Sequence, residues 1–265
     1  MANQTETKIQ ELSEHIAKAY ELKEGVRPVT ELVPDLEIDK AYAIQLETIN
    51  VQLATGKKIT GKKIGLTSAA MQKSLGVDEP DYGHLFDDMA YENNATVPFD
   101  RLLQPRVEGE IAFVLKKDLA GPNVTSFDVM MATDYVVPAL EIVDSRIKDW
   151  KIKLEDTVAD NGSSALYVLG NNPTKLTDID LKMVGMTFYK NGKLVNSGIG
   201  AAALGDPAKC VAWLANKLAA YDITLKAGEV ILSGALSAAI PAEPGDSFTA
   251  KFSHFGEVTV TFSKE

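Results

Sequence analysis

The stretch RVEGEIAFVL, residues 106–115, sets two acidic residues at the start of an apolar run that is typical of a buried β-strand. Side chains alternate across a strand, so Glu108 and Glu110 are expected to project from the same face. A second strand-like run, VVPALEIV at 136–143, places a third carboxylate, Glu141, among apolar residues. A buried charge without a partner is costly, so this pattern needs an explanation.

A shared divalent cation would remove that cost for all three carboxylates. Ligation by carboxylate oxygens is the preference of Mg²⁺ or Mn²⁺ rather than of zinc, and the chain has only three histidines. The alternative is that Glu108 and Glu110 line a solvated strand face while Glu141 pairs with Arg106 or Arg146. From the residues alone, both interpretations stay open.

The segment GKKIGLTS, residues 61–68, carries two adjacent lysines before a tight glycine turn. On a strand, Lys62 and Lys63 would face opposite sides. One can then be solvated while the other points inward, where a nearby metal and burial could lower its pKa toward that of a useful acid or base. Two ordinary surface lysines are the alternative.

Two polar segments could also contribute to a site. EPDYGHLFDDM at 79–89 is broken by Pro80 and Gly83, which predicts a loop holding Asp81 and His84, either functional or a solvated acidic turn. DTVADN at 156–161 offers side chains that could cap a helix or lie around a metal.

The bulk properties exclude several classes of partner. With a formal net charge of −10, neither nucleic acid nor an anionic membrane surface is expected to bind. The N-terminal segment lacks the apolar region of a signal peptide, and no run of about 18 apolar residues could cross a membrane, which predicts a cytoplasmic protein. The single cysteine, Cys210, lies on the apolar side of a predicted helix and reads as a buried, inert thiol.

The chain reads as α+β, with an N-terminal helical cap or arm over residues 1–60 and a β-rich catalytic domain over 61–265. The first part predicts helices over 8–22 and 38–53, the second capped by Asp39. In the second part, Asn191-Gly192 predicts a type I′ hairpin and Asp206-Pro207 the start of a helix through Tyr221. Further strands are predicted at 165–170, 229–234, 247–252 and 257–262.

Six segments in this order resemble the 2-hydroxypenta-2,4-dienoate (2-keto-4-pentenoate) hydratase / 4-oxalocrotonate decarboxylase family of the fumarylacetoacetate hydrolase superfamily. They are GKKIGLTS, EPDYGHLFDDM, QPRVEGEIAFVL, VVPALEIVDSRIKDW, DTVADN and the region from WLAN to LKAGEVILSGAL. The resemblance covers nearly the whole chain. It implies a fumarylacetoacetate-hydrolase-like β-roll and mixed sheet with an N-terminal helical extension.

The resemblance also implies roles for individual residues. Glu108, Glu110 and Glu141 match the family's metal ligands for Mg²⁺ or Mn²⁺, and Lys63 matches its acid–base or electrostatic lysine. Asp81 resembles the aspartate of the hydratases, where a carboxylate can steer or deprotonate the attacking water. Further residues are expected around the metal or the substrate: Leu66, Arg106, Asp156, Asp160 and Asn161.

The expected activity is a hydro-lyase reaction in aromatic meta-cleavage catabolism that adds water to 2-hydroxypenta-2,4-dienoate and gives 4-hydroxy-2-oxopentanoate. The alternatives are a 4-oxalocrotonate (2-oxo-3-hexenedioate) decarboxylase, a 2-oxohept-4-ene-1,7-dioate hydratase, since WLANKLAAYD resembles diacid-specific relatives, and a scaffold partner of a decarboxylase. The resemblance implies a homo-oligomer, which could associate with a pathway decarboxylase or aldolase.

Overall fold

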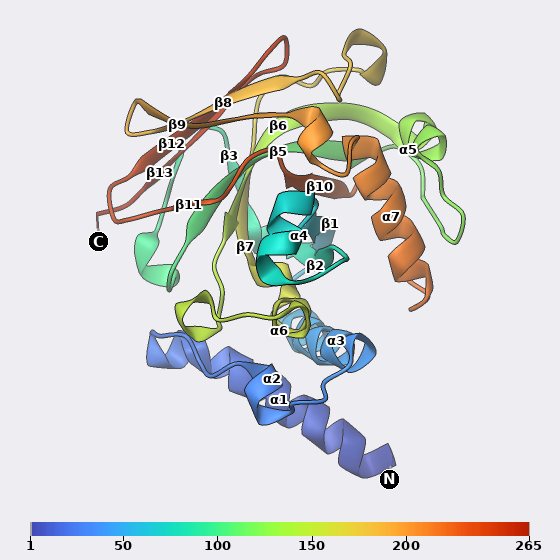
Figure 1. Cartoon of the computed structure of the whole chain (residues 1–265), viewed down its shortest axis with the longest axis vertical. Coiled ribbons are helices and arrows are strands. Elements are labelled where there is room, and N and C mark those ends of the chain that lie inside the picture. Colours follow the sequence, from blue (N-terminus) through green and yellow to red (C-terminus); the bar gives the residue numbers. More distant parts are fainter. Residues whose placement is uncertain (1, 265) are drawn as a thin grey trace.

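A computed structural model describes residues 2–264 and confirms the α+β class, with helices on the outside of two β-sheets (Figure 1). The α-helices are α1 (Ala2–Leu22), α2 (Val29–Leu32), α3 (Ile38–Ala54), α4 (Ala69–Leu75), α5 (Ser126–Ala132), α6 (Leu154–Ala159) and α7 (Pro207–Ala219). The 3₁₀ turns are η1 (Asp87–Met89), η2 (Phe99–Arg101), η3 (Lys148–Trp150), η4 (Asn161–Ser163), η5 (Leu176–Asp178) and η6 (Gly200–Ala202).

The larger sheet runs in the order β2-β1-β10-β5-β6-β7-β3, with the short β11 added to β5. Its strands are β1 (Ile59–Gly65), β2 (Asp81–Phe86), β3 (Ala90–Glu92), β5 (Arg106–Leu115), β6 (Thr133–Val143), β7 (Ser164–Leu169), β10 (Val230–Ala235) and β11 (Ile240–Pro241). The sheet curls so that β2 contacts β7, which gives it an inner face (Figure 1).

The second sheet packs against the outer face of the first and has the order β4-β13-β12-β8-β9. Its strands are β4 (Ala95–Val97), β8 (Gly185–Lys190), β9 (Lys193–Ile199), β12 (Ser247–Phe252) and β13 (Gly256–Phe262). The β8–β9 turn confirms the predicted type I′ hairpin, since Asn191 and Gly192 both have positive φ, 53° and 74°. A Cβ on Gly109 of β5 would meet Met186 of β8, so glycine permits the close approach of the sheets.

The main hydrophobic core extends from Leu12 in α1 to Phe262 in β13, so the N-terminal helices share it with the sheets. These helices lie together at one end of the molecule, beside α6 (Figure 1). A second, smaller cluster fills the inner face of the curled sheet: Leu85, Ala112, Val137, Ala139, Tyr167 and Leu232. By strand alternation, Ala112 and Ala139 share this face with Glu110 and Glu141, so the acidic residues border a dry interior.

Of the predictions for single helix caps and loops, one is confirmed and two are wrong. The start of α7 is confirmed, because the Asp206 carboxylate accepts a hydrogen bond from the amide of Ala208 with proline at the first helical position. Asp39 as a cap is wrong, since Glu37 holds the N-cap position of α3 and the Asp39 carboxylate instead accepts from Tyr221. The prediction of a loop over 79–89 is wrong for residues 81–86, which form the buried strand β2.

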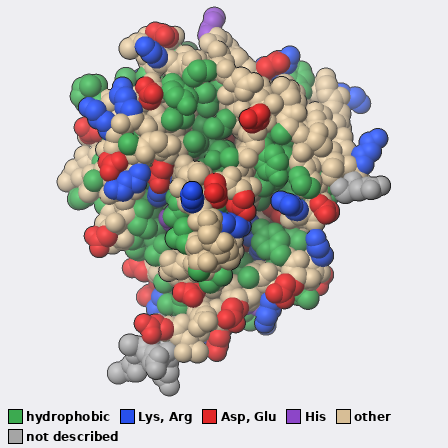
Figure 2. All heavy atoms as spheres, turned by 180° about the vertical axis from the view of Figure 1, so that it is seen from behind, with side chains coloured by type: hydrophobic (Ala, Val, Ile, Leu, Met, Phe, Trp, Pro, Cys, Tyr) green, Lys and Arg blue, Asp and Glu red, His purple; other side chains and the backbone are tan. Residues whose placement is uncertain are grey.

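Charged side chains are spread over the visible face of the molecule, and the single cysteine is buried. On the face seen in Figure 2, acidic and basic side chains are interspersed with hydrophobic ones rather than gathered into one charged patch. Among residues 2–264, no helix combines the length and the apolar character needed to span a bilayer. Cys210 is fully buried in α7, and this burial raises the pKa of its thiol, which suits an inert side chain.

Candidate metal and substrate site

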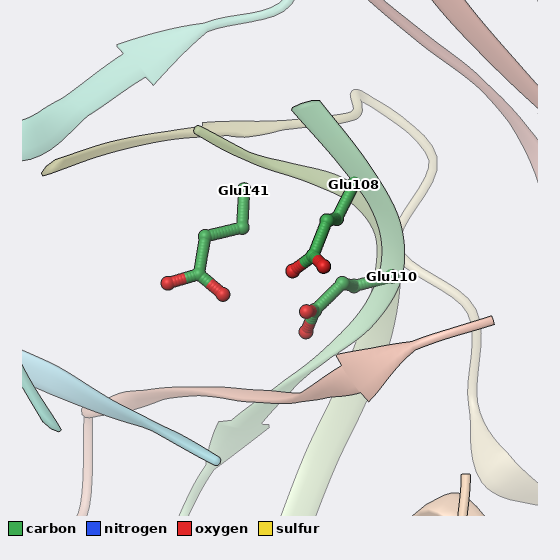
Figure 3. Close-up of side chains that lie close together, drawn as sticks. All are labelled: Glu108, Glu110 and Glu141. Carbon is green, nitrogen blue, oxygen red and sulfur yellow. The ribbon is translucent and has the colours of Figure 1, made fainter. Parts of the chain in front are cut away.

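Three glutamates converge on the inner face of the larger sheet (Figure 3). Glu108 and Glu110 project from β5, and the neighbouring strand β6 places Glu141 directly opposite Glu108. One carboxylate oxygen from each residue lies within 4.8 Å of the other two. The expected convergence of the three side chains is therefore present in the fold.

The trio holds more negative charge than its surroundings neutralise. Glu110 and Glu141 are fully buried, and within residues 2–264 no donor forms a well-oriented hydrogen bond with Oε1 of Glu110 or with either oxygen of Glu141. Burial, followed by the charge of Glu141, raises the pKa of Glu108 to about 8. Oxygen-only donors with unused lone pairs in a dry setting fit a hard divalent cation.

Lys63 lies beside the trio and is also buried. Its ammonium donates to the carbonyl of Gly162 at 2.9 Å and to Asp81 Oδ1 at 3.3 Å, and lies 3.7 Å from Glu141 Oε2. Burial alone would lower the pKa of Lys63, but the charges of Asp81 and Glu141 outweigh it and raise the pKa. The expected lowering assumed a metal beside Lys63 and stays a prediction.

Lys62 points to the opposite side of β1, as the strand pattern predicts, but it is not solvated. Its ammonium is buried and donates to both oxygens of Glu229, at 2.7 and 2.8 Å. The expectation of one solvated lysine is therefore wrong, because Lys62 is buried in an ion pair with Glu229 on the opposite face of β1.

Asp81 opens strand β2 and is 4% exposed. Its Oδ2 accepts a hydrogen bond from the Thr157 hydroxyl at 2.8 Å, which orients the carboxylate toward Lys63. A Cβ on Gly65 would lie 2.3 Å from Asp81 Oδ1 and 2.7 Å from Lys63 Nζ. Glycine at position 65 is therefore what leaves room for this pair.

A cavity of about 240 Å³ opens onto these groups. Lys63, Asp81 and Glu108 line it, together with the predicted Leu66 and Arg106. Its remaining wall is largely apolar and includes Met71, Val143, Trp150 and Ile152. The cavity can thus enclose a small acid with a short hydrocarbon tail beside three carboxylates, a lysine and an arginine.

Asp156, Asp160 and Asn161 do not line this cavity, so their expected place around the metal or the substrate stays a prediction. The Asp156 carboxylate accepts from Thr30 and from the Lys153 amide, so it caps α6 and ties it to α2. Asp160 forms a buried ion pair with Arg146. Asn161 exchanges two hydrogen bonds with the backbone of His84, so all three residues brace the site from behind.

The alternative partners of Glu141 are engaged elsewhere. Arg146 is held by Asp160, and the guanidinium of Arg106 lies 4.3 Å from the centroid of the Trp150 ring. Trp150, Thr157 and Gly162 were not singled out from the sequence. Their contribution comes from positions adjacent to the site only in three dimensions, and no periodicity or spacing marks them.

His84 is a structural histidine. The residue is buried, with 3% of its surface exposed, and its Nδ1 lies 3.1 Å from the Gln45 side-chain oxygen. The amide nitrogen of Gln45 donates to the carbonyls of Tyr82 and Val158, so its oxygen is the acceptor for His84 Nδ1–H. Burial lowers the pKa of His84 to about 3, which keeps the ring neutral.

The chain is similar to known proteins over nearly its whole length. A 2-hydroxyhexa-2,4-dienoate hydratase from Comamonas testosteroni is 47% identical over 261 residues, 98% of this chain and 97% of the relative. A 2-keto-4-pentenoate hydratase from Paraburkholderia xenovorans is 46% identical over 253 residues, 96% and 94% of the two chains.

A solved structure is similar over the same extent. The 4-oxalocrotonate decarboxylase from Pseudomonas putida G7, complexed with magnesium and adipate, superposes with a TM-score of 0.93 at 37% identity and covers 97% of this chain and 98% of its own. The sequence model described as fumarylacetoacetate (FAA) hydrolase C-terminal matches residues 63–263, which include Lys63, Asp81 and all three glutamates. The chain therefore belongs to the fumarylacetoacetate hydrolase family.

Proposed function

We propose that this protein is a divalent-metal-dependent hydratase that converts 2-hydroxypenta-2,4-dienoate into 4-hydroxy-2-oxopentanoate. The observation that carries the proposal is one cavity lined by Lys63, Asp81 and a member of the glutamate trio. Full-length relatives named as hydratases of five- and six-carbon dienoates support the choice of reaction.

Glu108, Glu110 and Glu141 would hold the cation, Mg²⁺ or Mn²⁺, because their clustered oxygens lack other partners. A divalent ion held by these residues would supply Lewis-acid stabilisation of the negative charge that develops on the substrate. The magnesium complex of the similar decarboxylase supports the use of a divalent ion.

Lys63 manages the first proton transfer. Its ammonium lies in the cavity wall beside Asp81, so Nζ can donate a proton to C5 of the dienol. The amine formed then takes the proton of the 2-hydroxyl, which leaves a 2-oxo-3-enoate and restores the ammonium. Asp81 and Gly162 keep Nζ in place during this exchange.

Asp81 serves the second stage. In the 2-oxo-3-enoate, C4 is electrophilic because it is conjugated with the carbonyl. Asp81 takes a proton from a water molecule whose oxygen bonds to C4, and the proton is returned at C3, so one water is added overall. Thr157 orients the carboxylate for this step through its hydrogen bond to Oδ2.

The decisive experiment incubates the purified chain and Mg²⁺ with 2-hydroxypenta-2,4-dienoate and follows the loss of dienoate absorbance and the formation of 4-hydroxy-2-oxopentanoate. Asp81→Asn should slow hydration about 100-fold; hydration at the wild-type rate would demote Asp81 to a structural residue. Binding of Mn²⁺ should be unchanged in this variant.

Decarboxylation of 2-oxo-3-hexenedioate is the second candidate, favoured by the 0.93 TM-score to a decarboxylase. Release of carbon dioxide from that diacid without hydration of the monoacid would establish it. A chain that catalyses neither reaction but restores the activity of a decarboxylase would be a scaffold. Lys63, Asp81 and Glu108 line one cavity, with Glu110 and Glu141 clustered beside Glu108, and this arrangement argues for a catalyst.

A further inference from the structure

Arg106 lies in the cavity wall and interacts electrostatically with Glu108 without forming an ion pair with it. Within residues 2–264, neither an ion pair nor a side-chain hydrogen bond reaches its guanidinium, although the residue is half-buried and lines the same cavity as Lys63 and Glu108. The guanidinium lies over the Trp150 ring. A guanidinium carries five N–H donors, so a partly dehydrated one without acceptors is suited to an anion from outside the chain.

The Trp150 ring is held in place by its own loop. The indole Nε1 donates to the carbonyl of Gln104 at 3.0 Å, and the Gln104 side chain donates to the carbonyls of Ser145 and Ile147. Asp149 and Trp150 both adopt left-handed backbone conformations, with φ of 58° and 55°. Such strain persists where the surroundings enforce it, often at ligand sites. The stacked ring therefore fixes the direction of the guanidinium before any ligand arrives.

Arg106 also stands in a fixed relation to the trio. It lies two residues before Glu108 on the same face of β5, a separation of about 7 Å along the strand. Its cross-strand neighbour is Val143, two residues beyond Glu141. Arg106 is thus positioned on the cavity wall next to Glu108.

We propose that Arg106, held against Trp150, binds the C1 carboxylate of the substrate and so positions the 2-oxo acid head. The inference rests on the proposed function: a substrate carboxylate that lies beside acidic side chains needs positive charge and N–H donors from the protein. Gly162 and Asp81 take two of the three N–H donors of Lys63, and the third serves the proton transfer. Arg106 supplies charge-assisted N–H donors at the neighbouring position.

A role at the head of the substrate predicts effects that do not depend on the tail. Arg106→Gln should raise KM for both 2-hydroxypenta-2,4-dienoate and 2-hydroxyhexa-2,4-dienoate, and the inhibition constant of pyruvate, by one common factor of about 10 to 100, as loss of a charge-assisted hydrogen bond implies. The kcat should fall less than threefold. Arg106→Lys should restore part of the affinity, because it keeps the charge but loses the planar fork.

Two further variants separate positioning from general damage. Trp150→Leu should raise the pyruvate inhibition constant about 3- to 10-fold and Trp150→Phe less, because a phenyl ring still supports stacking. The matched control is Arg101→Gln, since Arg101 lines a separate cavity of about 330 Å³ beside α1 and should leave all these constants unchanged.

The binding of Mn²⁺ separates this inference from the proposed function. If Arg106→Gln leaves the pyruvate inhibition constant unchanged, or weakens only a diacid such as 2-oxohept-4-ene-1,7-dioate, Arg106 does not bind the head and the inference is overturned. An equal loss of Mn²⁺ affinity in Arg106→Gln would also overturn it. Failure of the wild-type chain to bind Mn²⁺ would instead refute the metal site itself.

Discussion

Strand β1 carries two adjacent buried lysines on opposite faces, and the two lysines face different numbers of carboxylates. On one face, Lys62 meets a single carboxylate, Glu229, whose oxygens are also bound by the Lys226 amide. On the other, the single ammonium of Lys63 faces Asp81 and the three glutamates. The first arrangement neutralises itself, whereas the second leaves surplus negative charge.

The comparison teaches how to separate structural from functional burial of charge. A self-contained pair costs desolvation but leaves no group without a partner, so it holds two parts of the chain together. A surplus of one sign destabilises the free protein and persists where a ligand neutralises it. We therefore expect substitutions on the Lys63 face to affect activity and those on the Lys62 face to affect stability.

The largest effect should come from Glu110→Gln. Loss of one anionic ligand should abolish Mn²⁺ binding measured by calorimetry and lower turnover by about 10⁴-fold or more. The same change removes like-charge repulsion, so urea unfolding of the metal-free variant should give a free energy about 1–3 kcal/mol above that of the wild type. Wild-type Mn²⁺ affinity in this variant would remove Glu110 from the metal site.

Lys63→Met should follow, with turnover reduced by about 10²- to 10⁴-fold through loss of the proton-transfer group. Because this lysine offsets part of the surplus negative charge, the metal-free variant should also unfold more easily, and saturating Mg²⁺ should recover most of the difference. Steady-state rates and thermal unfolding with and without Mg²⁺ provide the measurement. Equal destabilisation in both conditions would mean that Lys63 belongs to the structural class.

Lys62→Met provides the matched opposite. It leaves Glu229 buried without its cation, so the free energy of unfolding should fall by about 3–5 kcal/mol, while the folded fraction keeps its kcat. A double variant with Glu229→Gln should regain much of that loss, since the unpaired charge is gone. If Lys62→Met lowered kcat as strongly as Lys63→Met, the contrast between the two faces would be broken.

The smallest effect concerns His84, which pairs in register with Lys62 and shares its face. Burial lowers its pKa to about 3, whereas the unfolded chain protonates it near 6.5. The unfolded state thus binds more protons between these values, so stability is highest above pH 6.5 and falls as the pH drops, by up to about 1.4 kcal/mol per pH unit.

The His84→Gln variant should therefore lose stability more gradually than the wild type between pH 6.5 and 5, by about 1–2 kcal/mol over that interval. Urea unfolding at several pH values gives the slope, which is compared rather than the absolute stability because the substitution also alters packing. The exposed His254, replaced by Asn, should leave the slope unchanged. A wild-type slope in His84→Gln would mean that His84 is protonated in the folded chain.

Sequence patterns were sufficient where one strand or turn carries its own signal. Alternation along residues 106–115 placed two glutamates on one face, and the Asn191-Gly192 pair fixed a hairpin. The convergence of Glu141 with them could be expected only from the cost of burying it and from the family resemblance. The register between β5 and β6, which places Glu141 opposite Glu108, is known only from the structure.

The failures share a physical cause: partners that lie far away in the chain. Residues 81–86 look like a polar loop, yet Asp81 bonds Thr157 and His84 bonds Gln45, so their polarity is satisfied inside a buried strand. Lys62 looks solvated because Glu229 follows it by 167 residues. Local propensity cannot encode such pairings, which tertiary packing decides.

The absence of a side chain at Gly65 has a practical consequence for altering which acids the protein accepts. Mutational libraries should leave this position fixed, because any larger residue would displace the acid–base pair before it touched a new substrate. The apolar wall can be varied instead. Met71, Val143 and Ile152 border the cavity and have no polar side chain, so smaller residues there would admit a substrate with a longer tail and leave Lys63 and Asp81 in place.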